Sequence, residues 1–81
     1  MKVVHSLTVQ ARCPVDSQLD TYEATFTASR VVKVEDILAA IKRVANRKVF
    51  QEDLTCQLAR ELGMSVTTIG YHSGVRTEVS A

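Results

Sequence analysis

A cysteine and an aspartate stand seven residues apart near the start of the chain, and Pro14 follows Cys13 directly while Asp20 closes the segment. A cysteine thiolate is a nucleophile that can form covalent intermediates, and a nearby carboxyl group can carry the protons that such a reaction moves. Proline, aspartate and serine lie between the two residues and predict a turn. Cys13 and Asp20 are therefore candidate catalytic residues. A buried, inert cysteine and a turn-closing aspartate are the structural alternatives.

A second group of polar residues, Gln51, Glu52 and Asp53, follows Phe50 where a helix is expected to begin. Carboxylates at such a position can accept hydrogen bonds from a ligand. Acidic residues in the first turn of a helix also complement the helix dipole, so a purely structural role for Glu52 and Asp53 stays open.

Other side chains capable of chemistry have simpler explanations. Cys56 falls beside leucines spaced four apart and is expected to be an inert packing residue. His5 falls on an apolar strand face and is expected in the core or at an interface, whereas His72 stands beside a predicted turn and could line a site. A small basic cluster near the end of a predicted helix either complements the dipole or contacts phosphate groups. Its members are Lys42, Arg43, Arg47 and Lys48.

Alternating apolar and polar residues predict two strands at the start of the chain. The alternation covers residues 3–12 and 21–28, and the turn-like residues 14–19 lie between them. One face of the first strand is apolar and is expected to be buried. The chain therefore opens with a β-hairpin.

Helical spacing then replaces the alternation. Apolar residues recur every three or four positions from Val34 to Ala45, and a second helix is expected from about Gln51 until Gly63 ends it. From Ser65 onward β-branched and aromatic residues dominate, and Ser73-Gly74 predicts a turn between two further strands. The order ββααββ predicts an α+β fold in which a four-stranded antiparallel sheet carries both helices on one face.

The size of the chain predicts one domain, residues 1–81, that associates with copies of itself. A domain this small buries only about 60% of its unfolded surface and gains modest stability from its core. The net charge of +1 favours no particular partner, and no apolar run approaches the roughly 20 residues of a membrane span. Two cysteines without metal-ligand spacing, and no signal-peptide core at the N-terminus, predict a cytoplasmic protein with reduced thiols and no metal.

Three motifs stand in order along the chain: Cys13-Pro14 with Gln18 and Asp20, then Asn46 with Phe50 to Asp53, then Gly74-Val75-Arg76-Thr77. Their order and spacing resemble the C-P-x-x-x-Q-x-D, N-x-x-x-F-H-E-D and Gly-Ile-x-Thr-like patterns of a known family. This is the tunnelling-fold (T-fold) family of 7-cyano-7-deazaguanine nitrile reductases, called QueF. The resemblance covers nearly the whole chain from Cys13.

The resemblance implies a role for each candidate residue. Cys13 would be the nucleophile, Asp20 would transfer protons, and Glu52 would anchor the edge of a purine base, with Gln51 beside it in the substrate-binding segment. Addition of a thiolate to a nitrile carbon gives a covalent thioimide, and the nitrile nitrogen gains a proton as the sulfur attacks. A carboxylate can accept two parallel hydrogen bonds from a guanine-like ring edge. Sites between the subunits of a homo-oligomeric barrel are implied as well.

Two departures from the reductase pattern concern the step that follows thioimide formation, in which the reductases reduce the thioimide. Gln51 stands in place of the family's histidine and cannot carry a proton at neutral pH. The reductases bind NADPH through an E-x-K-S-x-K stretch, whereas residues 34–40 contain neither its lysines nor its serine. The related archaeosine-forming amidinotransferases lack that stretch and release the same thioimide with ammonia on a tRNA base.

We therefore predict a QueF-like amidinotransferase that acts without a cofactor on a 7-deazaguanine base, either free or in tRNA. NADPH-dependent reduction of the nitrile to the aminomethyl product is the first alternative. A T-fold module that binds its ligand without turning it over is another.

A rival from a different class is a DNA-binding helix-turn-helix over residues 58–69. Ala59, Gly63, Ser65 and Ile69 fall at its small, turn, cap and apolar positions. Residues from Ser65 onward would then form a recognition helix in the major groove. The abundance of Val, Thr, Ile and Tyr in residues 66–79 favours strand instead, and the near-neutral charge argues against a DNA binder.

Overall fold

Strands β1 (Val3–Arg12) and β2 (Leu19–Ala28) form the predicted antiparallel hairpin in the computed structural model, which describes residues 1–81. The predicted alternation is confirmed, because the apolar residues of both strands face the helices. β2 begins two residues earlier than the predicted strand, since Leu19 and Asp20 continue the ladder opposite the last residues of β1. Asp20 therefore belongs to a strand and not to the turn.

Helices α1 (Val34–Val44) and α2 (Gln51–Leu62) confirm the two predicted helices. Neither has a side-chain hydrogen bond at its N-cap. Gly63 ends α2 as predicted, with a left-handed φ of 64° and with its N–H donated to the Ala59 carbonyl. Glycine adopts this conformation without the steric cost that a Cβ atom brings.

Strands β3 (Ser65–His72) and β4 (Val75–Ser80) form the second predicted hairpin. Both residues of the connecting turn have positive φ, 51° at Ser73 and 80° at Gly74. Two consecutive left-handed residues match the twist of the flanking strands, which is why such turns join hairpins.

The helix-turn-helix alternative is wrong. Residues 58–62 are the last turn of α2, and residues 65–72 are a strand that pairs with both β2 and β4. The β-branched residues of this segment fit a pleated, half-buried surface better than a helix. No second helix follows Gly63, so the chain has no recognition helix at that place.

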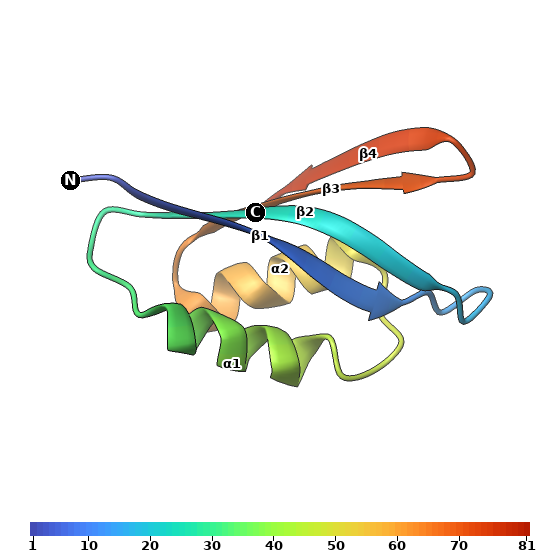
Figure 1. Ribbon diagram of the computed structural model, residues 1–81, viewed down its shortest axis with the longest axis horizontal. Helices are drawn as coiled ribbons and strands as arrows, with labels where there is room; N and C mark the ends of the chain where they lie inside the picture. Colours follow the sequence, from blue (N-terminus) through green and yellow to red (C-terminus); the bar gives the residue numbers. More distant parts are fainter.

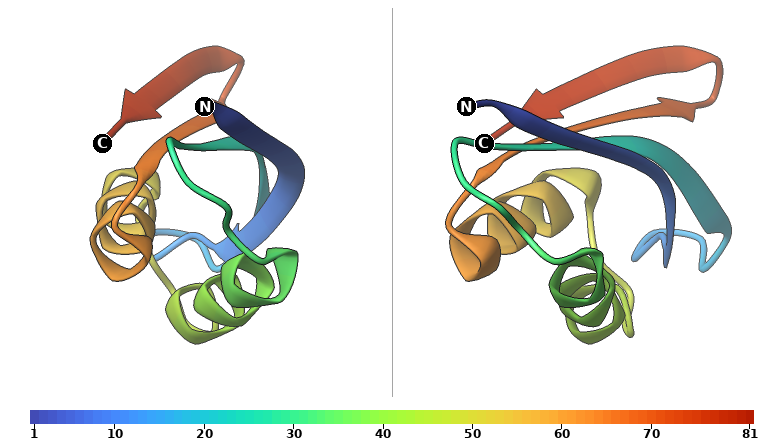
Figure 2. Two further views of the ribbon diagram at one scale, coloured as in Figure 1. Left: turned by 90° about the vertical axis from the view of Figure 1, so that its left-hand side faces the viewer. Right: turned by 60° about the vertical axis from the view of Figure 1, so that its left-hand side comes forward.

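The four strands lie in the order β1-β2-β3-β4, and both helices cover one face of the sheet (Figure 1). The sheet twists and curves over the helices (Figure 2). This arrangement confirms the predicted α+β architecture. Neither helix combines the length and the apolar character needed to cross a membrane.

The apolar core lies between the sheet and the helices and contains 14 buried residues. Phe26, Leu54, Leu58 and Val66 are completely buried at its centre. Toward the far end of the sheet, where β1 ends and β2 begins, buried polar side chains replace these apolar ones. The candidate site lies there.

Candidate functional site

One pocket contains all four predicted site residues. Cys13, Asp20, Gln51 and Glu52 line a cavity of about 330 Å³ that lies between the turn after β1, the start of α2 and the end of β3. Its other lining residues are Pro14, Val15, Asp16, Tyr22, Val49, Phe50, His72 and Ser73. The fold therefore brings together residues that are up to 60 positions apart, from Cys13 to Ser73.

A tight turn holds Cys13 at one side of this pocket. The Cys13 N–H donates to the Gln18 carbonyl and the Ser17 N–H donates to the Cys13 carbonyl, both at 2.9 Å. Within the turn, the Gln18 N–H donates to Asp16 Oδ1 at 3.0 Å. Ser17 has a left-handed φ of 63°, which costs a non-glycine residue about 1 kcal/mol. The predicted turn is confirmed, and its hydrogen bonds fix the backbone that carries the thiol.

The Cys13 sulfur is free, half-buried and contacted by a hydrogen-bond donor. The Val15 N–H points at Sγ at 3.4 Å. A backbone N–H in this position stabilises negative charge on sulfur, the form in which cysteine attacks. The first residues of α2 line the same pocket, and the positive end of the helix dipole favours an anion there.

The two walls of the pocket are joined directly beside Cys13. The Val49 N–H donates to the Arg12 carbonyl at 3.0 Å, and Arg12 forms a parallel bridge with Lys48. The residues just before α2 are therefore held against the residue just before the cysteine. This contact fixes the distance between the thiol and the helix start.

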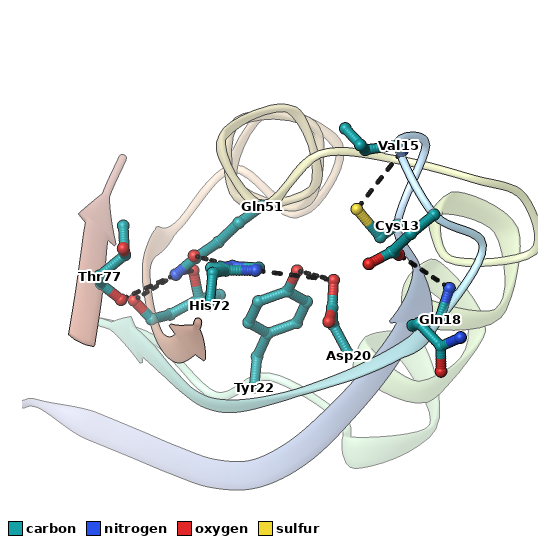
Figure 3. A network of polar contacts seen from close by, with 10 residues as sticks. Cys13, Val15, Gln18, Asp20, Tyr22, Gln51, His72 and Thr77 are labelled. Carbon is teal, nitrogen blue, oxygen red and sulfur yellow. Dashed lines mark hydrogen bonds and ion pairs between the residues drawn. The ribbon is translucent and has the colours of Figure 1, made fainter. Parts of the chain in front are cut away.

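A row of polar side chains crosses the pocket from the cysteine turn toward β4 (Figure 3). The Tyr22 hydroxyl donates to Asp20 Oδ2 at 3.3 Å, and His72 Nδ1 lies 3.8 Å from the same oxygen. On its other side the imidazole places Nε2 3.2 Å from Gln51 Oε1. One carboxylate oxygen is thus shared by a phenol and an imidazole.

Tyr22 is buried beneath this row, and its environment keeps it neutral. Burial raises the pKa of the Tyr22 hydroxyl above the ordinary range of tyrosine, and the charge of the neighbouring Asp20 carboxylate raises it further. The neutral hydroxyl can act as a donor to the carboxylate. The tyrosine ring occupies the space above Gly70, where a Cβ atom would lie 2.5 Å from Tyr22 Cδ1.

Gln51 forms the floor of the row and is only 3% exposed. Its amide nitrogen donates to the Thr77 carbonyl at 3.0 Å and to the carbonyl and hydroxyl of Thr68, each at 3.2 Å. The Thr55 hydroxyl donates to the Gln51 carbonyl at 2.7 Å. The amide nitrogen is occupied by protein acceptors, so Gln51 shapes the pocket wall. Its contact with a substrate stays a prediction.

Glu52 differs from the buried Gln51 because its side chain has no protein partner that occupies it. It is exposed, lines the pocket and takes part in none of the ion pairs of the chain. Its neighbour Asp53 does not line the pocket. Of the two adjacent carboxylates, Glu52 is therefore the one available to a ligand in the cavity.

Other predicted residues lie away from the pocket. Cys56 is exposed, so its predicted packing role is wrong: Leu54 and Leu58 take the core side of α2 and leave position 56 toward solvent. His5 is half-buried on the helix-facing side of β1, as predicted. In the basic cluster, Arg43 pairs with Glu61. No group of three His, Cys, Asp or Glu side chains lies close enough to hold a metal ion.

Tyr22 was missing from the predicted site and could be placed only on an apolar strand face. His72 was expected beside a turn as a residue that could line a site, and it does line the pocket, but its contacts there were not predicted. The available signal for Tyr22 was its spacing, because a residue two positions after Asp20 on a strand shares its face. The contacts of His72 with Asp20 and Gln51 depend on how β3 and α2 meet, which no local pattern contains.

The comparisons with known proteins give a likeness of structure. No family model matches the chain, and no curated protein matches it. The crystal structure of the archaeosine synthase QueF-Like in the apo form superposes with a TM-score of 0.88 at 21% sequence identity. The match covers 99% of this chain and 90% of that chain. The likeness confirms the predicted tunnelling fold and the structural resemblance to QueF-like proteins.

Proposed function

We propose that this protein is a QueF-like enzyme in which Cys13 forms a covalent thioimide with the nitrile of a 7-cyano-7-deazaguanine base. The observation that carries the proposal is the meeting of Cys13, Asp20 and Glu52 in one cavity of about 330 Å³. Cavities of this size hold small ligands. The fold shared with an archaeosine synthase supports the same substrate class.

The first half of the reaction uses the two sides of the pocket. The Cys13 thiolate attacks the nitrile carbon, one π pair of the C≡N bond moves to nitrogen, and that nitrogen takes a proton from Asp20. The product is a thioimide, C(=NH)–S. The Val15 N–H that contacts the sulfur supports the thiolate before the attack.

The second half uses ammonia. Its lone pair attacks the thioimide carbon, a C–N bond forms, and the C–S bond breaks with its electron pair on Cys13. The proton that ammonia loses returns to Asp20. The sum is addition of ammonia to a nitrile, which gives an amidine and regenerates the thiolate without any change in oxidation state.

The base itself would be held by the start of α2. The Glu52 carboxylate can accept two parallel hydrogen bonds from the N–H groups of a guanine-like edge. Phe50, which is 49% exposed and lines the pocket, offers an aromatic face on which a flat ring can stack. Recognition and attack would then come from opposite walls.

Amidine formation is favoured over reduction by the composition and position of α1. Residues 34–40 contain no lysine and no serine, and no residue of α1 lines the pocket. Reduction would need a bound NADPH, whereas ammonia needs only access to the thioimide. We therefore propose that the reaction uses no cofactor. The chemistry needs a reduced thiol, and both cysteines are free, which fits a cytoplasmic protein.

The base is proposed to be part of a tRNA. A second hollow of about 380 Å³ lies along the end of β1 and is lined by Arg12, Arg47 and Lys48. None of these three side chains forms an ion pair within the chain. They directly precede the cysteine turn and α2, so a polynucleotide whose base enters the pocket would bring phosphates near them.

Self-association is proposed through the open edges of the sheet. β1 and β4 each pair on one side only. Unpaired strand edges are templates for pairing with another copy of the chain. The pocket would then lie close to a subunit boundary, as the resemblance to the T-fold family implies.

Intact-mass measurement tests the proposal. The native protein is incubated with 7-cyano-7-deazaguanine, and separately with tRNA that carries it, and is compared with Cys13→Ala and Cys56→Ala. We expect the native protein and Cys56→Ala to gain the full mass of the nitrile compound and Cys13→Ala to gain none. Addition of ammonium should then release an amidine. NADPH oxidation in the same mixture would favour reduction, and no adduct with either substrate would falsify the thioimide proposal.

A further inference from the structure

His72 ends β3 beside the candidate catalytic carboxylate, with each ring nitrogen facing a protein group. Nε2 lies 3.2 Å from Gln51 Oε1, and Nδ1 lies 3.8 Å from Asp20 Oδ2. The ring centroid lies 6.0 Å from that of Tyr22. The side chain is 39% exposed, so the imidazole reaches solvent as well as the row of polar side chains that Figure 3 draws.

Gln51 determines which ring nitrogen carries the proton. Its amide nitrogen donates to the carbonyls of Thr68 and Thr77, so a reversed amide would set its oxygen against two carbonyl oxygens. The atom that faces the imidazole is therefore the amide oxygen, which only accepts. His72 must place a proton on Nε2 to donate to it. The neutral imidazole is then the Nε2–H tautomer, with its lone pair on Nδ1.

In this tautomer the lone pair is on Nδ1, the ring nitrogen that lies 3.8 Å from Asp20 Oδ2. A lone pair and a carboxylate oxygen that face each other repel, whereas a proton on either atom turns the contact into an attraction. The Tyr22 hydroxyl donates to the same oxygen at 3.3 Å and keeps it oriented toward the ring. The geometry thus provides a place for one proton between His72 and Asp20.

We propose that His72 is the proton partner of Asp20, taking a proton from solvent at Nδ1 and passing it to Oδ2, from which it reaches the substrate. The part of this proposal that concerns the substrate rests on the proposed function. A carboxylate on its own has no proton to donate, whereas an imidazole that already carries a proton on one ring nitrogen can take up a second on the other and pass it on. Because it acts through Asp20, His72 is a positioning and proton-supplying residue.

His72 and Asp20 together supply the one proton that the reaction consumes and take back the one that it releases. Attack of the Cys13 thiolate on the nitrile consumes the one shared proton, which passes from Nδ1 to Oδ2 and from there to the nitrile nitrogen. Attack of ammonia on the thioimide releases one proton, which passes to Oδ2 and from there back to Nδ1 as the C–S bond breaks. His72 therefore ends each turnover in its starting state.

Nitrogen NMR of ¹⁵N-histidine-labelled protein tests the arrangement without any substrate. The His72 signals are assigned by their loss in His72→Gln. We expect the neutral ring to be protonated at Nε2, and the Nδ1 signal alone to move in Asp20→Asn. An Nδ1–H tautomer, or an Nδ1 signal that ignores Asp20→Asn, would overturn the proposal. This result stands even if the native protein forms no adduct, which is the failure of the proposed function alone.

Adduct kinetics test the proton supply. We expect His72→Gln to slow single-turnover adduct formation by about 10²- to 10⁴-fold. The rate of His72→Gln should depend less on pH than the native rate and should recover partly with free imidazole in the buffer. His5→Gln, which changes the other histidine, should keep the native rate. A slowed His72→Gln with the native pH profile and no rescue, or a rate within tenfold of native, would contradict the proposal.

The pH profile also contains contributions from other titratable groups near His72. Asp20 and Tyr22 face it from β2, while Cys13 on the turn and Glu52 on α2 line the same pocket. All four are present in both His72→Gln and the native protein. The difference between the two profiles therefore isolates the imidazole.

Discussion

Phe26 and Asp20 lie on the same inner face of β2, six residues apart, yet they belong to two different environments. Phe26 is completely buried in the apolar core, to which β3 contributes Val66 and α2 contributes Leu54 and Leu58. Asp20 contacts a phenol and an imidazole. The buried face of α2 changes in parallel, from Leu58 near its end to Gln51 at its start. One sheet face and one helix thus run from an apolar core into a polar site.

The difference shows how this small domain combines a stable apolar core with a polar candidate site. At the apolar end the free energy of folding comes from burial, which depends on area and packing and has no direction. At the polar end each buried group needs a partner, because an unsatisfied one costs about 1–3 kcal/mol. Gln51 and Thr68 meet that need within the protein, whereas the Cys13 sulfur and the Glu52 carboxylate face the cavity.

The largest expected change in stability comes from the apolar end. Phe26→Ala should lower the free energy of unfolding by about 3–5 kcal/mol through lost burial and a cavity. The melting temperature should fall by at least about 12 °C for a domain of this size. Phe26→Leu, which keeps most of the volume, should lose less than half as much in thermal unfolding. A small effect of Phe26→Ala would contradict the central place of this residue in the core.

Gly70→Ala tests the region where the apolar core meets the polar site. The added Cβ atom would lie 2.5 Å from the buried Tyr22 ring, so the ring must move and with it the donor to Asp20. Overpacking of this kind costs about 1–3 kcal/mol. We expect slower adduct formation as well as lower stability in urea unfolding. In a Tyr22→Ala background the added cost of Gly70→Ala should disappear, and an undiminished cost there would refute the clash.

Alkaline pH should reduce the contribution of Tyr22, at the polar end of the molecule, to the free energy of unfolding. The pKa of Tyr22 is raised in the folded protein, so the folded state keeps a proton that the unfolded state loses above about pH 10. The stabilisation that Tyr22 provides is complete below that pH and falls as the pH rises, by about 1.4 kcal/mol per pH unit. Urea unfolding at pH 9 and pH 11 should show this loss in the native protein relative to Tyr22→Phe. Equal pH dependence in the two proteins would contradict it.

The smallest expected effect comes from the exposed thiol. Cys56 lies on the solvent side of α2, outside both the core and the pocket. Cys56→Ser should change the free energy of unfolding by no more than about 0.5 kcal/mol and leave adduct formation at the native rate. A clear loss of stability or of the rate of adduct formation would show that the Cys56 side chain contacts another molecule, such as a second copy of the chain.

The strands and helices could be predicted because their signals are local. Alternation over residues 3–12 and helical spacing up to Gly63 each depend on neighbouring residues only. Local patterns did not predict the exposure of Cys56. The leucines near it in the sequence indicated packing, but they did not show on which side of the helix position 56 lies. The predicted strand also began at residue 21 and left out Leu19 and Asp20, because their pairing with the end of β1 is a longer-range contact.

The candidate site could be predicted only in part for the same reason. Cys13, Asp20 and Glu52 were found through motif spacing, and the structure places them in one cavity. The contact of His72 with Gln51 depends on the register of β3 and on the packing of α2 beneath it. Such contacts follow from tertiary structure and leave no periodic trace in the chain.

Site-resolved mass spectrometry of the native protein tests the central claim most directly, because the chain contains two free thiols in contrasting places. The protein is incubated with 7-cyano-7-deazaguanine or the tRNA that carries it, digested under conditions that preserve the thioimide, and its cysteine peptides are compared. We expect the nitrile compound on the Cys13 peptide and none on the Cys56 peptide, with the reaction lost when the protein is unfolded in urea. Modification of Cys56 to the same extent, or of neither cysteine, would contradict the assignment of Cys13 as a nitrile-capturing nucleophile.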